Sequence, residues 1–327
     1  MKKKYRCLAL FSGGLDSMLS VVHMQRIGYE VIPVFFMTPF FGPEKAKKAA
    51  ELINTELVIR DITDEHIKML QNPRYGFGRN MNPCIDCHGL MFRLAAVMLT
   101  EFKADFLISG EVLGQRPMSQ RHDALNSVGK LSKVKDLIVR PLSQKLLSDT
   151  LPVREGWVNK EDMLDIQGRG RHRQMQLAEE YGIKHFPNPG GGCLLTDIGY
   201  SRKLRDLISF DMLMIEFIKY LKIGRHFRIS DRVKLIVGRD NQDNENLESI
   251  SKSEIILQPV SLPGPMGVIN SREEPEETEF RLAARVLLRY HNKLTGSGEV
   301  VFIKDELEIL RIWEAGLDDS ETKKLLI

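Results

Sequence analysis

Long apolar runs are missing from this sequence of 327 residues, and no stretch approaches the length of a membrane span. The basic start at residues 1–5 leads into an apolar run that breaks at Ser12-Gly13-Gly14 without the small-residue pattern of a cleavage site. We therefore expect neither a membrane protein nor a signal peptide, but a cytoplasmic protein. The composition agrees, because 43% hydrophobic and 28% charged residues are ordinary for a globular chain.

Cysteine and excess charge are also scarce. Four cysteines in a long chain without an export signal exclude a disulfide scaffold and favour metal or redox chemistry. The net charge of +3 is too small to indicate nucleic-acid binding by itself, so an argument for RNA has to come from local clusters. Internal repeats and low-complexity tracts are absent from the sequence.

What the sequence does have is a glycine-rich turn at residues 11–17 (FSGGLDS), between an apolar run at 7–10 and an amphipathic segment at 17–27. A strand that turns sharply into a helix leaves backbone N–H groups free at the helix start, where phosphate binds well. The lysine that reaches the terminal phosphates in a Walker loop has no counterpart here. The turn is therefore predicted to bind the phosphates of a nucleotide without being a Walker loop.

The polar and small residues of the turn suit the binding of phosphates. Gly13 and Gly14 allow the backbone to approach phosphates closely. Ser12 and Ser17 can donate hydroxyl hydrogen bonds, and Asp16 can hold Mg²⁺ or a water.

Strand-like apolar runs alternate with helical patterns up to about residue 141. This order predicts an α/β fold, a doubly wound parallel sheet covered by helices on both faces. Ligands of such sheets lie at the carboxyl ends of the strands, where both the glycine turn and Ser109-Gly110-Glu111 are expected. One crevice is thus expected to hold the phosphates of a nucleotide and to reach a second substrate. The strand-like runs are 6–11, 31–37, 56–59 and 106–109, and the helical ones are 18–27, 42–53 and 89–102.

The rest of the chain is less regular. Residues 71–83, rich in Asn, Pro, Gly and Arg, indicate a long irregular loop of the kind that is often functional. We expect two domains, a nucleotide-binding one at 1–203 and a small α+β one at 204–327. The later helical patterns are 162–166, 174–181, 201–223 and 277–293, and the later strand-like runs are 234–238, 255–260 and 300–302.

Three of the four cysteines form a candidate site. Cys84 and Cys87 make a C-x-x-C, and Cys193 follows three glycines far along the chain, so the three thiols can meet in space. Three uses are open: an iron–sulfur cluster with one open iron, persulfide chemistry that ends in a disulfide, or a structural zinc. Zinc is the least favoured, because zinc sites usually carry paired C-x-x-C motifs. Cys7 is expected to be a core residue.

Together these motifs resemble the PP-loop tRNA thiolases, most closely the catalytic domain of the tRNA 4-thiouridine synthase family. Residues 11–17 are similar to its F-S-G-G-x-D-S, residues 109–115 (SGEVLGQ) to its S/T-G-E-x-L-G-Q, and residues 139–142 (VRPL) to its L-R-P-L. The similarity covers roughly the first 200 residues. It implies the PP-loop ATP pyrophosphatase fold and an ATP-dependent tRNA sulfurtransferase that forms AMP and pyrophosphate.

The resemblance also implies a set of site residues. Asp16, Cys84, Cys87 and Cys193 would be catalytic, with the three cysteines holding a [4Fe-4S] cluster as in some members of the family. ATP would lie with its phosphates on the glycine turn and its adenine near the end of the second strand. The residues expected to bind ATP and Mg²⁺ are Ser12, Gly13, Gly14, Asp16, Ser17, Phe36, Met37, Gly110 and Gln115.

A second resemblance lies in residues 233–247 (VKLIVGRDNQDNENL), which look like the start of the NFACT RNA-binding domain, over about residues 227–293. The synthases carry a THUMP region and some a rhodanese-like domain, neither of which we expect here, so free sulfide or a sulfur-carrier protein is the expected donor. The expected partner is tRNA, and a homodimer is left open. Arginines expected to contact the RNA backbone are Arg116, Arg169, Arg171 and Arg173.

Other functions stay open. A PP-loop ligase could adenylate a small molecule, although amide transfer needs no soft cysteine ligands. An RNA-binding protein could use the PP-loop only to sense ATP, and would keep its RNA affinity without thiolation. Sulfur removal from a thiolated base is a further alternative, against which ATP dependence would argue. The sequence assigns no role to Tyr75, Asp86 or His88, and fold support is the alternative role for Glu111 and Gln115.

Overall fold

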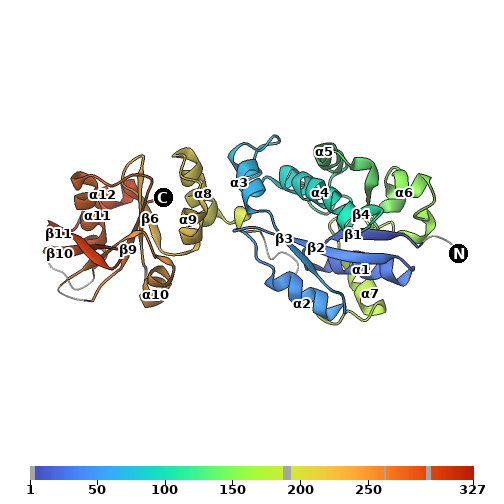
Figure 1. Ribbon diagram of the computed structural model, residues 1–327, viewed down its shortest axis with the longest axis horizontal. Helices are drawn as coiled ribbons and strands as arrows, with labels where there is room; N and C mark the ends of the chain where they lie inside the picture. Colours follow the sequence, from blue (N-terminus) through green and yellow to red (C-terminus); the bar gives the residue numbers. More distant parts are fainter. Residues whose placement is uncertain (1–3, 187–192, 261–262, 292–295) are drawn as a thin grey trace. The chain divides into compact units, whose positions relative to one another are not determined.

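The computed structural model describes residues 4–186, 193–260, 263–291 and 296–327. It divides into two compact units, Met1–Thr196 and Asp197–Ile327 (Figure 1). The domain boundary predicted at 203/204 lies seven residues later, inside a helix of the second unit, and stays a prediction for the functional domains. The three glycines that precede Cys193, residues 190–192, lie outside the described residues. So does Lys293, the last residue of the helix predicted at 277–293.

The first unit is built on a parallel sheet with the strand order β3-β2-β1-β4-β5. The central strand β1 pairs on one side with β2 and on the other with β4, so that Leu8 lies between Ile32 and Leu107. This confirms the predicted doubly wound fold. The strands are β1 (Arg6–Leu10), β2 (Glu30–Met37), β3 (Val58–Asp61), β4 (Phe106–Ser109) and β5 (Ile138–Val139).

Helices cover both faces of this sheet (Figure 1). Helices α1, α2 and α7 lie on one face, and α3, α4 and α5 lie on the other. The helices are α1 (Leu15–Arg26), α2 (Glu44–Leu52), α3 (Thr63–Gln71), α4 (Cys84–Glu101), α5 (His122–Ser132), α6 (Leu151–Arg154) and α7 (His172–Glu180).

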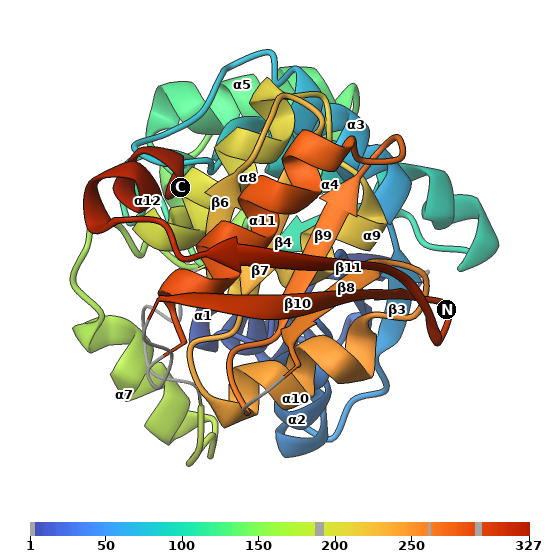
Figure 2. The same ribbon diagram turned by 90° about the vertical axis from the view of Figure 1, so that its left-hand side faces the viewer.

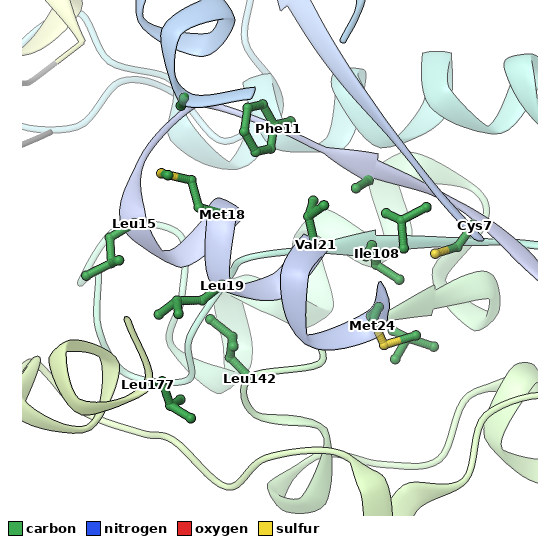
Figure 3. Packing of buried hydrophobic residues seen from close by; sticks show 14 of the residues in the cluster. Cys7, Phe11, Leu15, Met18, Leu19, Val21, Met24, Ile108, Leu142 and Leu177 are labelled. Atoms are coloured by element: carbon green, nitrogen blue, oxygen red, sulfur yellow. The ribbon is translucent and has the colours of Figure 1, made fainter. Parts of the chain in front are cut away.

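Helix α1 is anchored along its length in the core (Figure 3). Met18, Leu19 and Met24 are fully buried, and Leu19 lies beside Leu142 in the same cluster. Cys7 is also fully buried there, as expected from its place in a strand. Because each such side chain contributes roughly 1.5–3 kcal/mol on burial, the helix cannot shift easily, and the glycine turn that precedes it is held in place.

The second unit is a six-stranded antiparallel sheet with the order β11-β10-β8-β9-β7-β6. Helix α11 packs on one face, and Tyr220, Leu247 and Val268 form a smaller core on the other. Figure 2 shows β10 and β11 crossing the front of this unit. Its elements are α8 (Ile198–Ser209), α9 (Ile215–Ile218), β6 (Arg225–Arg228), β7 (Val233–Val237), α10 (Asn241–Ile250), β8 (Ile255–Pro259), β9 (Gly267–Ser271), α11 (Glu277–Arg289), β10 (Ser297–Lys304), β11 (Leu307–Ala315) and α12 (Asp319–Leu325).

Two predicted helices differ from the structure. The helix predicted at 162–166 is wrong: Asp162 ends a short 3-10 helix (Lys160–Asp162), and after it the backbone N–H groups of Leu164 and Ile166 donate to the carbonyls of Pro141 and Leu142 instead. The single helix predicted at 201–223 is interrupted: α8 ends at Ser209, Asp211 has a left-handed φ of 53°, and helical turns resume in α9 (Ile215–Ile218) and a 3-10 helix at Lys219–Lys222. None of the helices in the described part of the chain has the length and apolar composition of a membrane span.

Candidate functional site

The glycine-rich turn lies at the carboxyl end of β1 and opens α1. Gly13 has φ +74°, and a side chain there would bring its Cβ within 2.8 Å of the backbone of α2 at Ala46. The hydroxyl of Ser17 donates to the Gly14 carbonyl at 2.8 Å. The first intrahelical bond runs from Met18 N to Gly14 O at 3.1 Å, so the three preceding N–H groups have no acceptor within the helix. Such a cradle suits phosphate oxygens.

Asp16 is held by a chain of buried amides. Its Oδ2 accepts a hydrogen bond from Gln115 Nε2 at 2.6 Å, and Gln115 Oε1 accepts one from Gln174 Nε2 at 2.8 Å. The Arg171 guanidinium lies 3.8 Å from the same carboxylate. Asp16 Oδ1 is buried and has no hydrogen-bond partner in the part of the chain that the structure describes. A buried carboxylate oxygen without a partner is costly, and a hard cation such as Mg²⁺ fits it.

The structure brings together most of the amino acids predicted to bind the nucleotide. Sequence reasoning missed Gln174, which is fully buried on α7; a glutamine on the inner face of an amphipathic helix was the only signal available.

Gly110 contributes by close packing. A Cβ at this position would lie 2.5 Å from the carbonyl oxygen of Asp16 and 2.6 Å from the backbone nitrogen of Ser17. The hydroxyl of Ser20 on α1 donates to the Ser109 carbonyl at 3.2 Å. Only glycine therefore lets the end of β4 rest against the glycine turn, which joins the two predicted strand-end motifs into one site.

The two residues expected near the adenine differ in exposure. Phe36 is 4% exposed, and its side chain packs in the core between the sheet and α4. Met37 is half-buried, and its carbonyl accepts a hydrogen bond from Ile62 N at 3.0 Å. Adenine contact by this strand end stays a prediction, and only Met37 has a side chain near the surface.

Glu111 is the centre of a buried ionic network next to β4. Its two carboxylate oxygens contact His88 Nδ1 at 2.8 Å, Arg140 Nε at 2.8 Å and Ser109 Oγ at 3.1 Å. Burial by itself would raise the pKa of Glu111, but Arg140 and His88 outweigh it and lower the pKa to about 2. The carboxylate is thus charged at neutral pH, and it fixes the orientation of His88, which lies one residue after Cys87.

The C-x-x-C opens α4, with Cys84 as its first residue. Asn82 Nδ2 donates to Cys84 Sγ at 3.3 Å, and the buried His66 has its Nε2 3.5 Å from Cys87 Sγ. Burial raises the pKa of the Cys87 thiol, and negative charge on Cys193 and Cys84 raises it further. A site formed by all three thiols stays a prediction.

The fit to a metal is incomplete. Within the described residues, no group of three His, Cys, Asp or Glu side chains is placed to hold a metal ion. The glycines that precede Cys193 lie outside those residues. The iron–sulfur cluster on these cysteines therefore stays a prediction.

The four arginines predicted to contact RNA differ in their surroundings. Arg171 turns toward Asp16, and Arg173 lies 3.6 Å from Glu180. Arg116 and Arg169 are exposed. Contact with RNA stays a prediction for all four, and Arg171 is placed to meet a nucleotide at the glycine turn.

Two family models match the chain. Residues 3–145 match a family described as thiamine biosynthesis protein (ThiI), and residues 224–308 match the NFACT protein RNA binding domain. The chain thus joins a ThiI-type PP-loop region to an NFACT-type region, which confirms the two resemblances found in the sequence.

Individual known proteins are similar to parts of the chain. The chain is 29% identical over 182 residues to the tRNA-specific 2-thiouridylase MnmA of Endomicrobium trichonymphae, covering 46% of this chain and 49% of that protein. It is 30% identical over 150 residues to a probable tRNA sulfurtransferase of Thermococcus kodakarensis, covering 42% and 36%. It thus spans half or less of these curated relatives. A solved 4-thiouridine synthetase in complex with RNA and ATP is similar with a TM-score of 0.36 and 18% identity, covering 55% of this chain and 52% of that one.

Proposed function

We propose that the chain is a tRNA sulfurtransferase that uses ATP to replace a carbonyl oxygen of uridine with sulfur. The observation that carries the proposal is the glycine turn with Asp16, which lies in the first turn of α1 and has one buried carboxylate oxygen without a hydrogen-bond partner among the described residues. The match of residues 3–145 to the ThiI family and the thiouridylase relatives support the same chemistry. Magnesium at Asp16 and the cluster on the three cysteines are parts of this proposal.

The reaction has two steps. The target carbonyl oxygen attacks the α-phosphorus of ATP, and the bond to the β-phosphate breaks with release of pyrophosphate. Sulfide, or the outer sulfur of a cysteine persulfide, then adds to the same carbon, and the C–O bond breaks with AMP as the leaving group. With sulfide, uridine, ATP and sulfide are consumed, and thiouridine, AMP and pyrophosphate are formed. With a persulfide, a second cysteine closes a disulfide as the sulfur leaves.

The side chains take separate parts. The free N–H groups at the start of α1 bind the phosphates, and Asp16, held by Gln115 and Gln174, binds Mg²⁺ or orients the triphosphate. Arg171 balances negative charge at the same place. Cys84, Cys87 and Cys193 hold the sulfur or a [4Fe-4S] cluster, which would supply an open iron for sulfide.

The second unit is proposed to bind the RNA. Its support is the match of residues 224–308 to the NFACT RNA-binding domain. In this proposal residues 1–203 carry the chemistry and residues 204–327 help to hold tRNA. A sulfide or sulfur-carrier donor, a cytoplasmic location and a homodimer stay predictions.

Asp16→Asn and Cys193→Ala test the proposal. Unmodified tRNA transcripts are incubated anaerobically with ATP and sulfide, and thiouridine is measured by nucleoside mass spectrometry. We expect Asp16→Asn to lower the rate by at least roughly 100-fold, because a preorganised charge at the phosphates is lost. Cys193→Ala should abolish product while ATP binding is kept.

Matched controls are Asp64→Asn, an exposed carboxylate on α3, and Cys7→Ala, the buried core cysteine. Thiouridine formed by wild type without ATP, or formed equally by Asp16→Asn, would contradict the proposal. About four irons per chain in anaerobic protein, lost in Cys84→Ala, would support the cluster, whereas iron-free active protein would favour a persulfide.

A further inference from the structure

The loop between α3 and α4 carries aromatic and arginine side chains that the chemistry above does not use. Tyr75 is 42% exposed and Phe77 is 36% exposed, although large aromatic rings are usually covered. Arg74 and Arg79 flank them and are also exposed. In the part of the chain that the structure describes, neither arginine forms an ion pair, and residues 71–83 contain no aspartate or glutamate.

The loop backbone is nevertheless held in one conformation. Buried Asp86, on the first turn of α4, accepts hydrogen bonds from Arg74 N at 2.7 Å and Tyr75 N at 3.0 Å. The Gly76 N–H donates to the Pro73 carbonyl at 3.1 Å, and Gly76 has φ +68°, so the chain turns over residues 73–76, with Tyr75 inside the turn and Phe77 directly after it. The rings are thus displayed on a preorganised turn, which reduces the entropy cost of binding.

The same turn is tied to the cysteines. Gly78 N donates to the Asn82 carbonyl at 3.0 Å, and the Asn82 side chain donates to Cys84 Sγ at 3.3 Å. The Asn80 side chain donates to the Thr196 carbonyl at 2.6 Å, and Met81 N donates to the Leu195 carbonyl at 3.1 Å, which joins the loop to the chain just after Cys193. A molecule lying on the loop would therefore lie next to the sulfur site.

We infer that the segment 74–79 is an RNA-binding surface, on which Tyr75 and Phe77 stack with unpaired bases next to the target uridine while Arg74 and Arg79 contact phosphates. Interleaved aromatic rings and arginines without acidic partners match the chemistry of single-stranded nucleic acid. An adenylated base must be unstacked to reach Cys84, and an aromatic platform beside the site stabilises its unstacked neighbours. The inference rests on the proposed function and names how its substrate is held.

The first test measures equilibrium binding of an unmodified tRNA transcript to the full chain. Tyr75→Ala/Phe77→Ala should weaken binding at least 10-fold, since one stacked base is worth roughly 5- to 160-fold in affinity. Tyr75→Leu/Phe77→Leu should weaken it nearly as much, whereas Tyr75→Phe should bind like wild type. Because these side chains are exposed, all variants should unfold at the wild-type temperature.

The arginines have a matched control. Arg74→Ala/Arg79→Ala should lower the slope of log affinity against log salt by about two, one for each lost phosphate contact. Lys130→Ala/Lys133→Ala removes the same charge from exposed lysines at the end of α5, and should leave the slope unchanged.

A direct reporter is Phe77→Trp in a Trp157→Phe/Trp313→Phe background, where it is the single tryptophan. Stacking should quench its fluorescence when tRNA or oligouridylate is added, and a fully paired RNA duplex should not quench it. Wild-type affinity in both the alanine and leucine double variants, or absence of quenching with bound tRNA, would overturn the inference.

The outcomes separate this inference from the proposed function. If wild type forms thiouridine and Tyr75→Ala/Phe77→Ala binds and modifies tRNA equally well, the surface is wrong and the sulfurtransferase stands. If neither the wild type nor any variant makes thiouridine, but the aromatic variants lose RNA affinity, the RNA-binding surface stands and the proposed chemistry is wrong. If tRNA binding is unchanged and only transfer from a protein sulfur donor is lost, the loop contacts that donor, which also overturns the inference.

Discussion

Among single residues, Glu111 shows how a buried charge can depend on neighbours far along the chain. Its carboxylate and the Arg140 guanidinium are each less than a tenth exposed. Arg140 lies 2.8 Å from the Glu111 carboxylate, so removing the charge of Glu111 leaves the buried guanidinium without its ionic partner. Glu111→Gln keeps the shape and removes the charge. We expect the free energy of unfolding to fall by about 3 kcal/mol at pH 7, measured by denaturant titration.

The free energy of unfolding should also depend on pH in a definite direction if the Glu111 charge stabilises the fold. Because the folded-state pKa of Glu111 is lowered to about 2, its contribution to stability is present above pH 4.5 and is lost as the pH falls toward 2. The wild-type protein should therefore lose stability in this window faster than Glu111→Gln. The control is Asp136→Asn, which breaks the exposed pair with Arg154 and should change stability little. Equal pH profiles for wild type and Glu111→Gln would contradict the ionic account.

At the scale of elements, Asp86 is the residue that shapes the loop between α3 and α4. It accepts two backbone N–H groups of the loop, so Asp86→Ala leaves both without an acceptor. We expect amide hydrogen exchange at Arg74 and Tyr75 to become at least roughly 10-fold faster, since a bond to a charged acceptor is worth about 1.5–3 kcal/mol. Asp86→Asn, which keeps one acceptor oxygen, should have a smaller effect. Unchanged exchange in Asp86→Ala would mean that the remaining loop contacts suffice.

The elements also show where sequence reasoning succeeds. The strand predicted at 106–109 has the bounds of β4, because a continuous apolar run is a strong signal for a strand buried on both faces. The helix α5 was missed because its apolar stripe is short, Ala124, Leu125 and Val128, and polar residues and a glycine interrupt it. The false helix at 162–166 has a helical pattern, but backbone bonds to Pro141 and Leu142 win over that local preference.

In the candidate site, too, some contacts follow from local motifs and others do not. Strand-end motifs predicted correctly that the glycine turn and the segment at 109–111 meet, because parallel strands bring their carboxyl ends to one edge. The contacts of His88 with Glu111 and of His66 with Cys87 join residues more than twenty positions apart. Such pairings depend on how α3 and α4 pack, and no local spacing encodes them.

At the scale of the whole molecule, both units should lose stability over the same mildly acidic pH range. Each holds a buried histidine that is neutral when folded: His23, bonded to Tyr181 and to the Asp162 carbonyl, and His226, bonded to the carbonyls of Tyr220 and Ile223. Burial lowers the pKa of both below 6.5. Below pH 6.5 the unfolded chain therefore binds protons that the folded chain does not.

The chain's two tryptophans allow each unit to be followed separately, because Trp157 lies in the first and Trp313 in the second. Trp157→Phe and Trp313→Phe leave one reporter each, and denaturant unfolding is measured from pH 7.5 down to 5. Stability should fall with pH by at most about 1.4 kcal/mol per pH unit for each histidine. His23→Leu should make the profile reported by Trp157 less steep and leave that of Trp313 unchanged. The slope that remains in the first unit is that of buried His66, whose pKa burial lowers to about 4. His226→Leu should flatten the profile of Trp313 and leave that of Trp157 unchanged. Flattening of both profiles by one substitution would mean that the units unfold as a single cooperative body, because only then does a proton bound in one unit affect the stability of the other.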